Sequence, residues 1–222
     1  MPRLHVTLLL LICCVFAIAV NAKSAGQEEL SPQVETGTET FIRIFKSERV
    51  LEVWQKTPSA GAYSLSASFP ICSYSGSLGP KLKEGDRQAP EGFYKIYRSS
   101  LNPNSAYHLS FNLGFPNRYD RAHGRTGSYL MVHGACVSIG CYAMTDAGIE
   151  HIYGAVEKSL KDGQAHVPVH IYPFRMSDDA LAEAATDDWH GFWTNLKEGY
   201  DYFEENGVPA RIGVDGKRYV VL

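Results

Sequence analysis

The sequence lacks a long hydrophobic run, an excess of either charge and a recognisable metal-binding pair. Its longest apolar run, residues 6–20, has about 15 residues, whereas a membrane-spanning helix needs about 20. The 222 residues include 21 Lys+Arg and 24 Asp+Glu, so no polybasic surface for nucleic acid is expected. The histidines form no HExxH pair. We therefore predict no nucleic-acid partner, no metal site and no cofactor.

The N-terminal residues have the features of a secretory signal peptide. Arg3 precedes the apolar run, and Val20-Asn21-Ala22 offers small residues for cleavage. We predict a signal peptide at 1–22 and export of the protein, with an uncleaved anchor as the alternative. Residues 23–40 are rich in Ser, Gly, Gln, Glu and Thr and show almost no periodic hydrophobicity, which predicts a flexible leader.

From residue 41 the apolar residues alternate, as in β-strands. Residues 41–45 and 50–54 predict a hairpin, and further strand-like runs lie at 63–71, 92–98, 107–113, 129–133 and 166–171. Many short strands at this spacing favour a sandwich or barrel. Apolar residues between Ile149 and Leu160 then recur at helical spacing, with Thr145 or Asp146 as the cap and Gly163 just past the end. We predict a domain that is mainly β with added helices, an α+β fold.

The last segment, residues 173–222, differs in composition from this domain. Trp189, Phe192, Trp193 and Leu196 share one helical face, and Gly199 interrupts the pattern. The turn Val214-Asp215-Gly216-Lys217 predicts a final hairpin. We expect a helical cap and a hairpin placed as a roof over the functional site.

Three cysteines follow the signal peptide, which is an odd number for an exported chain. A disulfide between Cys72 and Cys136 would leave Cys141 free as a nucleophile. A bridge between Cys136 and Cys141 would disable or regulate that thiol, and three free thiols are a further alternative.

The stretch from His133 to Cys141 places a base, a thiol and two glycines within nine residues. A thiol attacks carbonyl groups as thiolate, so a nearby imidazole must take its proton or stabilise its charge. Gly140 lets the backbone turn tightly, and the N–H groups of Gly140 and Cys141 could face an oxyanion. Buried packing of an unrelated His and Cys is the alternative interpretation.

His133-Gly134 and Ser138-Ile139-Gly140-Cys141, together with the upstream runs Gly79-Pro80-Lys81, Gly85-Asp86 and 90–96, resemble the L,D-transpeptidases of the bacterial cell wall. The resemblance covers roughly residues 41–172. It is closest to a compact branch with the pattern HGxxxSxGCYAM, which includes the enzyme that releases murein lipoprotein from peptidoglycan. An L,D-transpeptidase-like β-sandwich or barrel and a periplasmic location are implied.

The resemblance implies covalent acyl transfer on peptidoglycan stem peptides. Cys141 would attack the carbonyl at the L centre of diaminopimelate, and His133 would take the thiol proton and return it to the leaving amine. An amine acceptor makes the enzyme a transpeptidase, whereas water makes it an amidase, with murein lipoprotein as a candidate partner. A catalytically silent wall-binding module is the alternative from another class.

The chain departs from the family pattern at Ile139 and Ala143, where most members have His and either Arg or Asn, so the contact for a substrate carboxylate is open. A second His-Gly pair begins at His123. We assign the base to His133, because residues 129–132 provide an apolar strand that delivers it. The substrate-contact candidates on the rim are His123, Arg121, Arg125 and Arg118. Ser138 would support the site by orienting the imidazole, by contacting substrate or only as a small turn residue.

Overall fold

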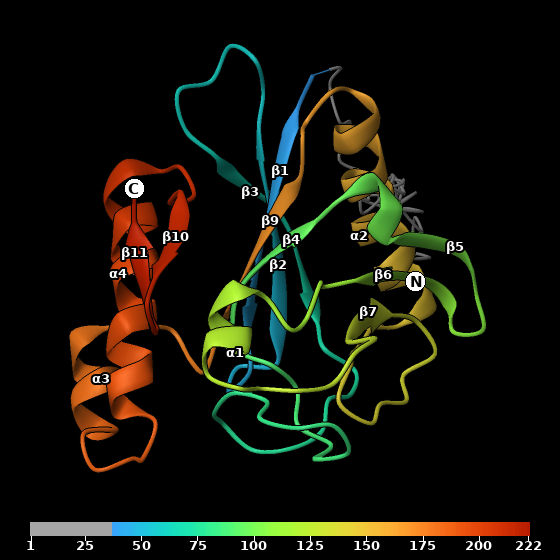
Figure 1. The fold of residues 1–222 in the computed structure, drawn as a ribbon. Coiled ribbons are helices and arrows are strands. Elements are labelled where there is room, and N and C mark those ends of the chain that lie inside the picture. The colour runs from blue at the N-terminus through green and yellow to red at the C-terminus, as the bar shows by residue number, and fades with distance from the viewer. Residues whose placement is uncertain (1–36) are drawn as a thin grey trace, which may run out of the picture. The chain divides into compact units, whose positions relative to one another are not determined.

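The computed structural model describes residues 37–222, so the predicted signal peptide and residues 23–36 of the predicted leader lie outside the described residues. A five-stranded mixed sheet has the order β3-β2-β1-β9-β4 (Figure 1). Its strands are β1 (Glu39–Phe45), β2 (Val50–Lys56), β3 (Ser64–Pro70), β4 (Gly92–Ile96) and β9 (Val167–Tyr172). The predicted hairpin is formed by β1 and β2, while β9 runs parallel to β1 and antiparallel to β4.

A second sheet of four strands holds the motif found in the sequence. It has the order β5-β6-β7-β8, with β5 (Leu101–Ser105), β6 (His108–Asn112), β7 (Met131–His133) and β8 (Tyr142–Ala143). A 3-10 turn, η1 (Arg98–Ser100), precedes β5, and α1 (Arg118–Ala122) lies between β6 and β7. Ser73 and Ala143 form a bridge that ties the segment after β3 to β8.

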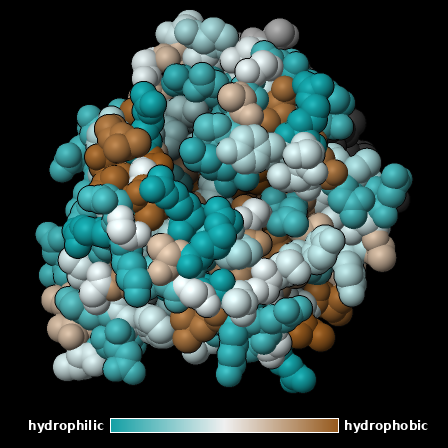
Figure 2. All heavy atoms as spheres, viewed as in Figure 1, coloured by the Kyte–Doolittle hydropathy of each residue, from teal (hydrophilic) through white to brown (hydrophobic). Residues whose placement is uncertain are grey.

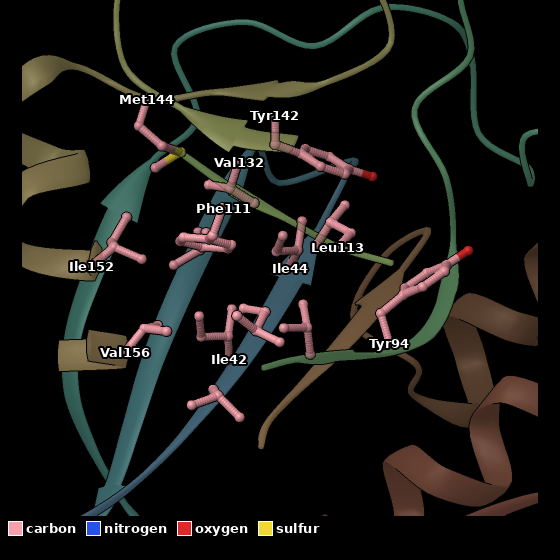
Figure 3. Packing of buried hydrophobic residues seen from close by; sticks show 14 of the residues in the cluster. Ile42, Ile44, Tyr94, Phe111, Leu113, Val132, Tyr142, Met144, Ile152 and Val156 are labelled. Atoms are coloured by element: carbon pink, nitrogen blue, oxygen red, sulfur yellow. The ribbon is translucent and has the colours of Figure 1, made fainter. Parts of the chain in front are cut away.

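The main core lies between the two sheets and α2 (Asp146–Lys161), the amphipathic helix predicted after Cys141. Because side chains alternate along a strand, Ile42 and Ile44 of β1 point to this core together. Figure 3 shows them beside side chains of the second sheet and α2, including Phe111, Val132, Tyr142, Ile152 and Val156. The Thr145 hydroxyl accepts the Gly148 N–H at 3.0 Å, so Thr145 is the cap of α2. The predicted α+β class is confirmed.

The C-terminal extension consists of α3 (Asp178–Glu183), α4 (His190–Asn206) and the hairpin β10 (Ile212–Asp215) and β11 (Arg218–Val221). It builds a second core with the opposite face of the five-stranded sheet, where Phe45, Phe93 and Tyr172 meet Trp193 and Leu196. In Figure 1, α4 and α2 lie on opposite sides of this sheet. The hydrogen bonds and ring contacts of the extension reach β1, β2, β4, β9, α1 and Glu91 but not residues 131–145, so it does not form the predicted roof over the motif. Within residues 37–222, no helix is long and apolar enough to cross a membrane.

One boundary differs from the sequence prediction. The predicted leader extended to residue 40, but β1 begins at Glu39 and Thr40 is buried. Thr40 fits there because its hydroxyl shares a 2.5 Å hydrogen bond with the Ser159 hydroxyl, a partner that hydrophobic periodicity does not detect. Gly199 interrupts the apolar pattern of the last segment, and α4 passes through it unbroken.

Gly199 is explained by packing. A Cβ at this position would lie 2.7 Å from Cζ of the Phe93 ring, closer than carbon atoms can approach. We predict that Gly199→Ala destabilises the protein by about 1–3 kcal/mol through overpacking, despite the better helix propensity of alanine. Urea denaturation at equilibrium measures this change.

Gly154 in α2 is the matched control, because a Cβ there meets nothing within 4 Å. Gly154→Ala should stabilise the protein by about 0.5–1 kcal/mol. Stabilisation by both substitutions would contradict the packing explanation.

Candidate active site

The pairing of β7 with β8 brings the chain segments that carry His133 and Cys141 together. These two strands are parallel, with Val132 opposite Tyr142 and His133 opposite Ala143. Cys141 lies in the bend two residues before Ala143, and its Sγ accepts the N–H of Met131 in β7 at 3.4 Å. The thiol is therefore held beside β7, the strand that ends at His133. Val132 and Tyr142, which lie opposite each other, both point into the core and so fix the register of the two strands.

His133 is buried and has a defined proton position. Its Nδ1 lies 2.7 Å from the carbonyl oxygen of Gly134, so Nδ1 carries the hydrogen and donates it. The Nε2 of the neutral ring then has a free lone pair. The Tyr107 ring packs against the imidazole with 4.8 Å between centroids. Burial lowers the pKa of His133 below its ordinary value, with the Gly134 bond acting in the opposite direction. His133 is therefore a neutral base at neutral pH.

Cys141 is the free cysteine of the described chain, and its thiol is partly buried. The Met131 N–H donates to its Sγ at 3.4 Å, and Sγ lies 3.7 Å from the Tyr129 carbonyl oxygen. Burial raises the pKa of the Cys141 thiol, while the Met131 N–H and the charge of Lys81 lower it. The two shifts together favour a resting pair of thiol and neutral imidazole, from which the proton moves only as sulfur attacks.

The structure selects one of the three cysteine alternatives, because Cys72 and Cys136 form a disulfide with 5.1 Å between Cα atoms. Ala135 and Cys136 both have left-handed backbone conformations, with φ of 65° and 53°, which side chains disfavour. The Ala135 N–H donates to Asp146 Oδ1 at 2.8 Å, and the Cys136 N–H donates to the Met144 carbonyl at 3.2 Å. The disulfide and these bonds hold the loop after His133 in place.

Gly134, which follows His133, packs against the same Asp146 carboxylate and has no room for a side chain. A Cβ on Gly134 would lie 2.6 Å from Asp146 Oδ1. Because Asp146 is the first residue of α2, the His-Gly pair packs directly on the beginning of that helix.

Ser138 and Gly140 shape the turn before the thiol. The Ser138 hydroxyl donates to the Cys141 carbonyl at 2.6 Å, which is a turn contact rather than a bond to the imidazole. Gly140 has φ of 100°, a conformation that favours glycine. Its N–H donates to the Ser75 hydroxyl at 2.6 Å, so it is occupied here and does not face an oxyanion as predicted. The N–H of Cys141 is the remaining candidate from that prediction.

The predicted rim residues Arg121, Arg125 and His123 bond to groups other than His133 and Cys141. Arg125 is buried, donates to Asp120 at 2.8 Å and lies over the Tyr119 ring, so it has a structural role that the sequence did not reveal. Arg121 donates to the Pro116 carbonyl. The His123 Nε2 lies 2.9 Å from the Lys217 carbonyl oxygen of the C-terminal hairpin. Neither these residues nor Arg118 has a bond to His133 or Cys141.

Sequence reasoning missed the segment 72–91, which lies beside the nucleophile turn. The Ser75 hydroxyl, which accepts the Gly140 N–H, donates to the Arg87 carbonyl at 2.7 Å. Arg87 has a left-handed backbone with φ of 56°, and its exposed side chain forms no ion pair or hydrogen bond with residues 37–222. Strained backbone of this kind is often found at functional sites. In the sequence, Gly79-Pro80-Lys81, Gly85-Asp86 and the start of 90–96 contributed only to the family resemblance, and no contact of this segment with the site was predicted.

Asp86 explains how this segment holds its shape. Its carboxylate accepts the N–H groups of Leu82, Lys83 and Gln88 at 2.9, 2.9 and 3.0 Å and pairs with Lys81. These bonds lower the pKa of Asp86, although its partial burial acts to raise it. Within residues 37–222, no group of three His, Cys, Asp or Glu is arranged to hold a metal ion.

Known proteins share both this sequence and this fold. The L,D-transpeptidase catalytic domain (YkuD) family matches residues 39–171. The chain is 46% identical over 216 residues to the Escherichia coli K12 protein named "Putative L,D-transpeptidase YafK", covering 96% of this chain and 87% of that protein.

Crystal structures of the helical cell shape determining protein Pgp2 from Campylobacter jejuni have a similar fold. One has a TM-score of 0.50 and 17% identity, over 81% of this chain and 73% of that chain. A point mutant has the same TM-score of 0.50 with 20% identity, over 75% of this chain and 59% of that chain. This chain therefore spans less than two thirds of the mutant's structure.

The pKa directions of the pair predict how Cys141 reacts with iodoacetamide. A resting thiol with a raised pKa is alkylated faster as pH rises, by about tenfold per unit from pH 6 to 8.5, without a plateau at neutral pH. Mass spectrometry of the peptide that carries Cys141 measures the rate.

His133→Ala should leave this pH profile nearly unchanged, because a neutral imidazole does not hold the thiolate by charge. A plateau below pH 7 that disappears in His133→Ala would show a thiolate–imidazolium pair instead.

Proposed function

The chain belongs to the L,D-transpeptidase family, and from this premise we propose that it is an exported, periplasmic cysteine enzyme acting on peptidoglycan stem peptides. Its target is the carbonyl at the L centre of diaminopimelate. One observation carries the proposal: the free thiol of Cys141 is bonded to β7, the strand that ends at the buried His133, whose Nδ1–H donates to Gly134 and leaves the Nε2 lone pair free to accept a proton.

In the first step, the Cys141 proton moves to His133 Nε2 as Sγ bonds to the carbonyl carbon. The oxygen becomes an oxyanion, for which the Cys141 N–H is the proposed donor. The carbon–nitrogen bond then breaks, and the imidazolium returns its proton to the leaving amine. A thioester on Cys141 and a neutral imidazole remain.

In the second step, an acceptor loses a proton to His133 and attacks the thioester, which regenerates the Cys141 thiol. An amine from another stem gives a crosslink, and a lysine of the murein lipoprotein gives an anchor. Water gives an amidase, which would release that lipoprotein from peptidoglycan. The pattern HGxxxSxGCYAM of the compact branch favours this hydrolytic outcome as the second candidate.

Arg87 is the proposed contact for a substrate carboxylate. The family position two residues after the nucleophile is Ala143 here, and Arg125 is committed to Asp120. A Cβ on Gly140 would lie 3.9 Å from the carbonyl carbon of Arg87, so this residue is next to the nucleophile turn. Its guanidinium has no anionic partner in residues 37–222. Arginine binds carboxylates through two parallel N–H bonds, which suits a free carboxylate near the scissile bond.

Incubation with purified sacculi, followed by mass analysis of the soluble and the digested products, tests the reaction. Lipoprotein fragments released with diaminopimelate indicate hydrolysis, while new links between diaminopimelate residues indicate transpeptidation. Cys141→Ala and His133→Ala should each reduce either product by at least ~10³-fold. His123→Ala should retain activity within about twofold.

Iodoacetamide should abolish the activity and a metal chelator should not. Full activity of Cys141→Ala would refute the nucleophile assignment, and binding of sacculi by wild type with neither product would favour the silent wall-binding module.

The contact of Arg87 is tested by Arg87→Gln. Loss of a charge-assisted bond pair should raise KM for a soluble stem peptide about tenfold or more and leave kcat within about twofold. An amidated substrate without the carboxylate should show no difference between wild type and variant.

Lys83→Gln is the control, because Lys83 is an exposed cation of the same segment with no ion pair in residues 37–222. An equal KM increase for both variants, or for the amidated substrate, would contradict a specific Arg87 contact.

A further inference from the structure

A hollow of the described chain lies away from Cys141 and His133. It has a volume of about 770 Å³ and is lined by β4, β9, the beginning of α1 and the segment from Pro209 to Val214. We call it the hairpin groove. Figure 2 shows the molecule in the orientation of Figure 1, with hydrophilic residues beside an apolar patch at the C-terminal hairpin.

Basic side chains are concentrated in the hairpin groove. Its lining includes Lys95, Arg118, Arg121 and Arg211. All four are exposed, and none of them forms an ion pair with residues 37–222. Elsewhere the chain pairs many of its cations, as Arg125 does with Asp120. Arg121 donates to the Pro116 carbonyl, whereas Lys95, Arg118 and Arg211 are available to an outside ligand.

The acidic side chain in the lining does not neutralise these cations. Glu39 lies 3.2 Å from Lys56 Nζ and also accepts the Tyr63 hydroxyl at 2.7 Å. Its charge is thus already balanced by Lys56. The side chains that line the hairpin groove carry a net positive formal charge in a chain whose formal net charge is −3, and a concave positive surface attracts anions.

The walls of the hairpin groove are aromatic and largely fixed. Phe93, Tyr94 and Tyr219 are buried core residues that also reach its surface, and the Phe93 and Tyr219 rings pack with centroids 4.7 Å apart. The half-exposed Tyr97 contributes a further ring. A rigid apolar wall with a few charged groups at its edge is typical of a ligand site, because the wall excludes water and the charges orient the ligand.

We propose that the hairpin groove is a second binding site for peptidoglycan, which holds a carboxylate-bearing stem peptide other than the one at Cys141. The identity of the polymer rests on the proposed function. Stem peptides carry several free carboxylates on a peptide backbone, which matches arginines spread along a groove with aromatic walls. Since a sacculus presents many linked stems, holding one stem raises the effective concentration of its neighbours at the thiol.

Binding to intact sacculi tests the proposal directly. The full chain with Cys141→Ala, which prevents turnover, is compared with the same chain carrying Arg118→Gln and Arg211→Gln. Lys83→Gln with Lys217→Gln is the matched control, because both are exposed cations outside the groove with no ion pair in residues 37–222. Unchanged circular dichroism and Tm verify that each variant folds.

The groove variant should bind sacculi about tenfold more weakly, with a shallower salt dependence, whereas the control should stay within about twofold. With Cys141 restored, the groove variant should act more slowly on sacculi but retain its kcat/KM on a single soluble stem peptide. Equal binding by the groove and control variants would overturn the second site. Wild-type turnover of the soluble peptide reports separately on the proposed function, since that substrate does not need the groove.

Discussion

A buried ion pair between Lys46 and Glu91 joins the parts of the molecule on which the candidate site depends. The Lys46 Nζ lies 3.0 Å from Glu91 Oε1, and both side chains are fully buried. The other carboxylate oxygen accepts the indole N–H of Trp193 in α4 at 2.8 Å. Lys46 also donates to the carbonyls of Ser77, Gly79 and Ala89 at 2.8, 3.0 and 3.1 Å. Burial lowers the pKa of Lys46, and Glu91 opposes that shift. Because both charges are fully bonded, removal of either partner would leave the other unpaired, at a cost of about 3–5 kcal/mol.

This pair holds the segment 72–91, which in turn contacts the nucleophile turn from one side. The Tyr142 hydroxyl donates to the Pro90 carbonyl at 2.7 Å, and Ser75 accepts the Gly140 N–H. Cys141 therefore lies between β7, which packs in the hydrophobic core, and the segment 72–91, which the buried ion pair holds in place. Such support from both sides keeps a reacting group in position before substrate binds. The same ion pair also supports the hairpin groove, since Glu91 directly precedes β4, which lines that groove.

The parts of this arrangement that depend on local sequence could be predicted, and the parts that depend on distant partners could not. Alternation along β1 and β2, helical spacing in α2 and the hairpin around Gly216 are properties of neighbouring residues, and the structure contains all three elements. The hydroxyl of the buried Thr40 has its hydrogen-bond partner 119 residues away in Ser159, so the polarity of Thr40 wrongly indicated that it belongs to the leader. Gly199 only interrupted the apolar pattern in the sequence, because Phe93, which requires a glycine there, lies in another element. Likewise, nothing in the sequence distinguished Arg125, paired with buried Asp120, from the unpaired Arg87.

The position of the disulfide has a practical consequence for handling the protein. Cys72 and Cys136 are 64 residues apart and close a ring that contains β4 to β7 and His133, while Cys141 lies just outside it. Closing a ring of this length removes about 4 kcal/mol of conformational freedom from the unfolded chain. Reductants are usually added to thiol enzymes to keep the nucleophile from oxidising. In this protein the same reagent would also reduce the Cys72–Cys136 disulfide and open the ring that contains the base. The reductant concentration that protects Cys141 is therefore limited by the concentration that this disulfide tolerates.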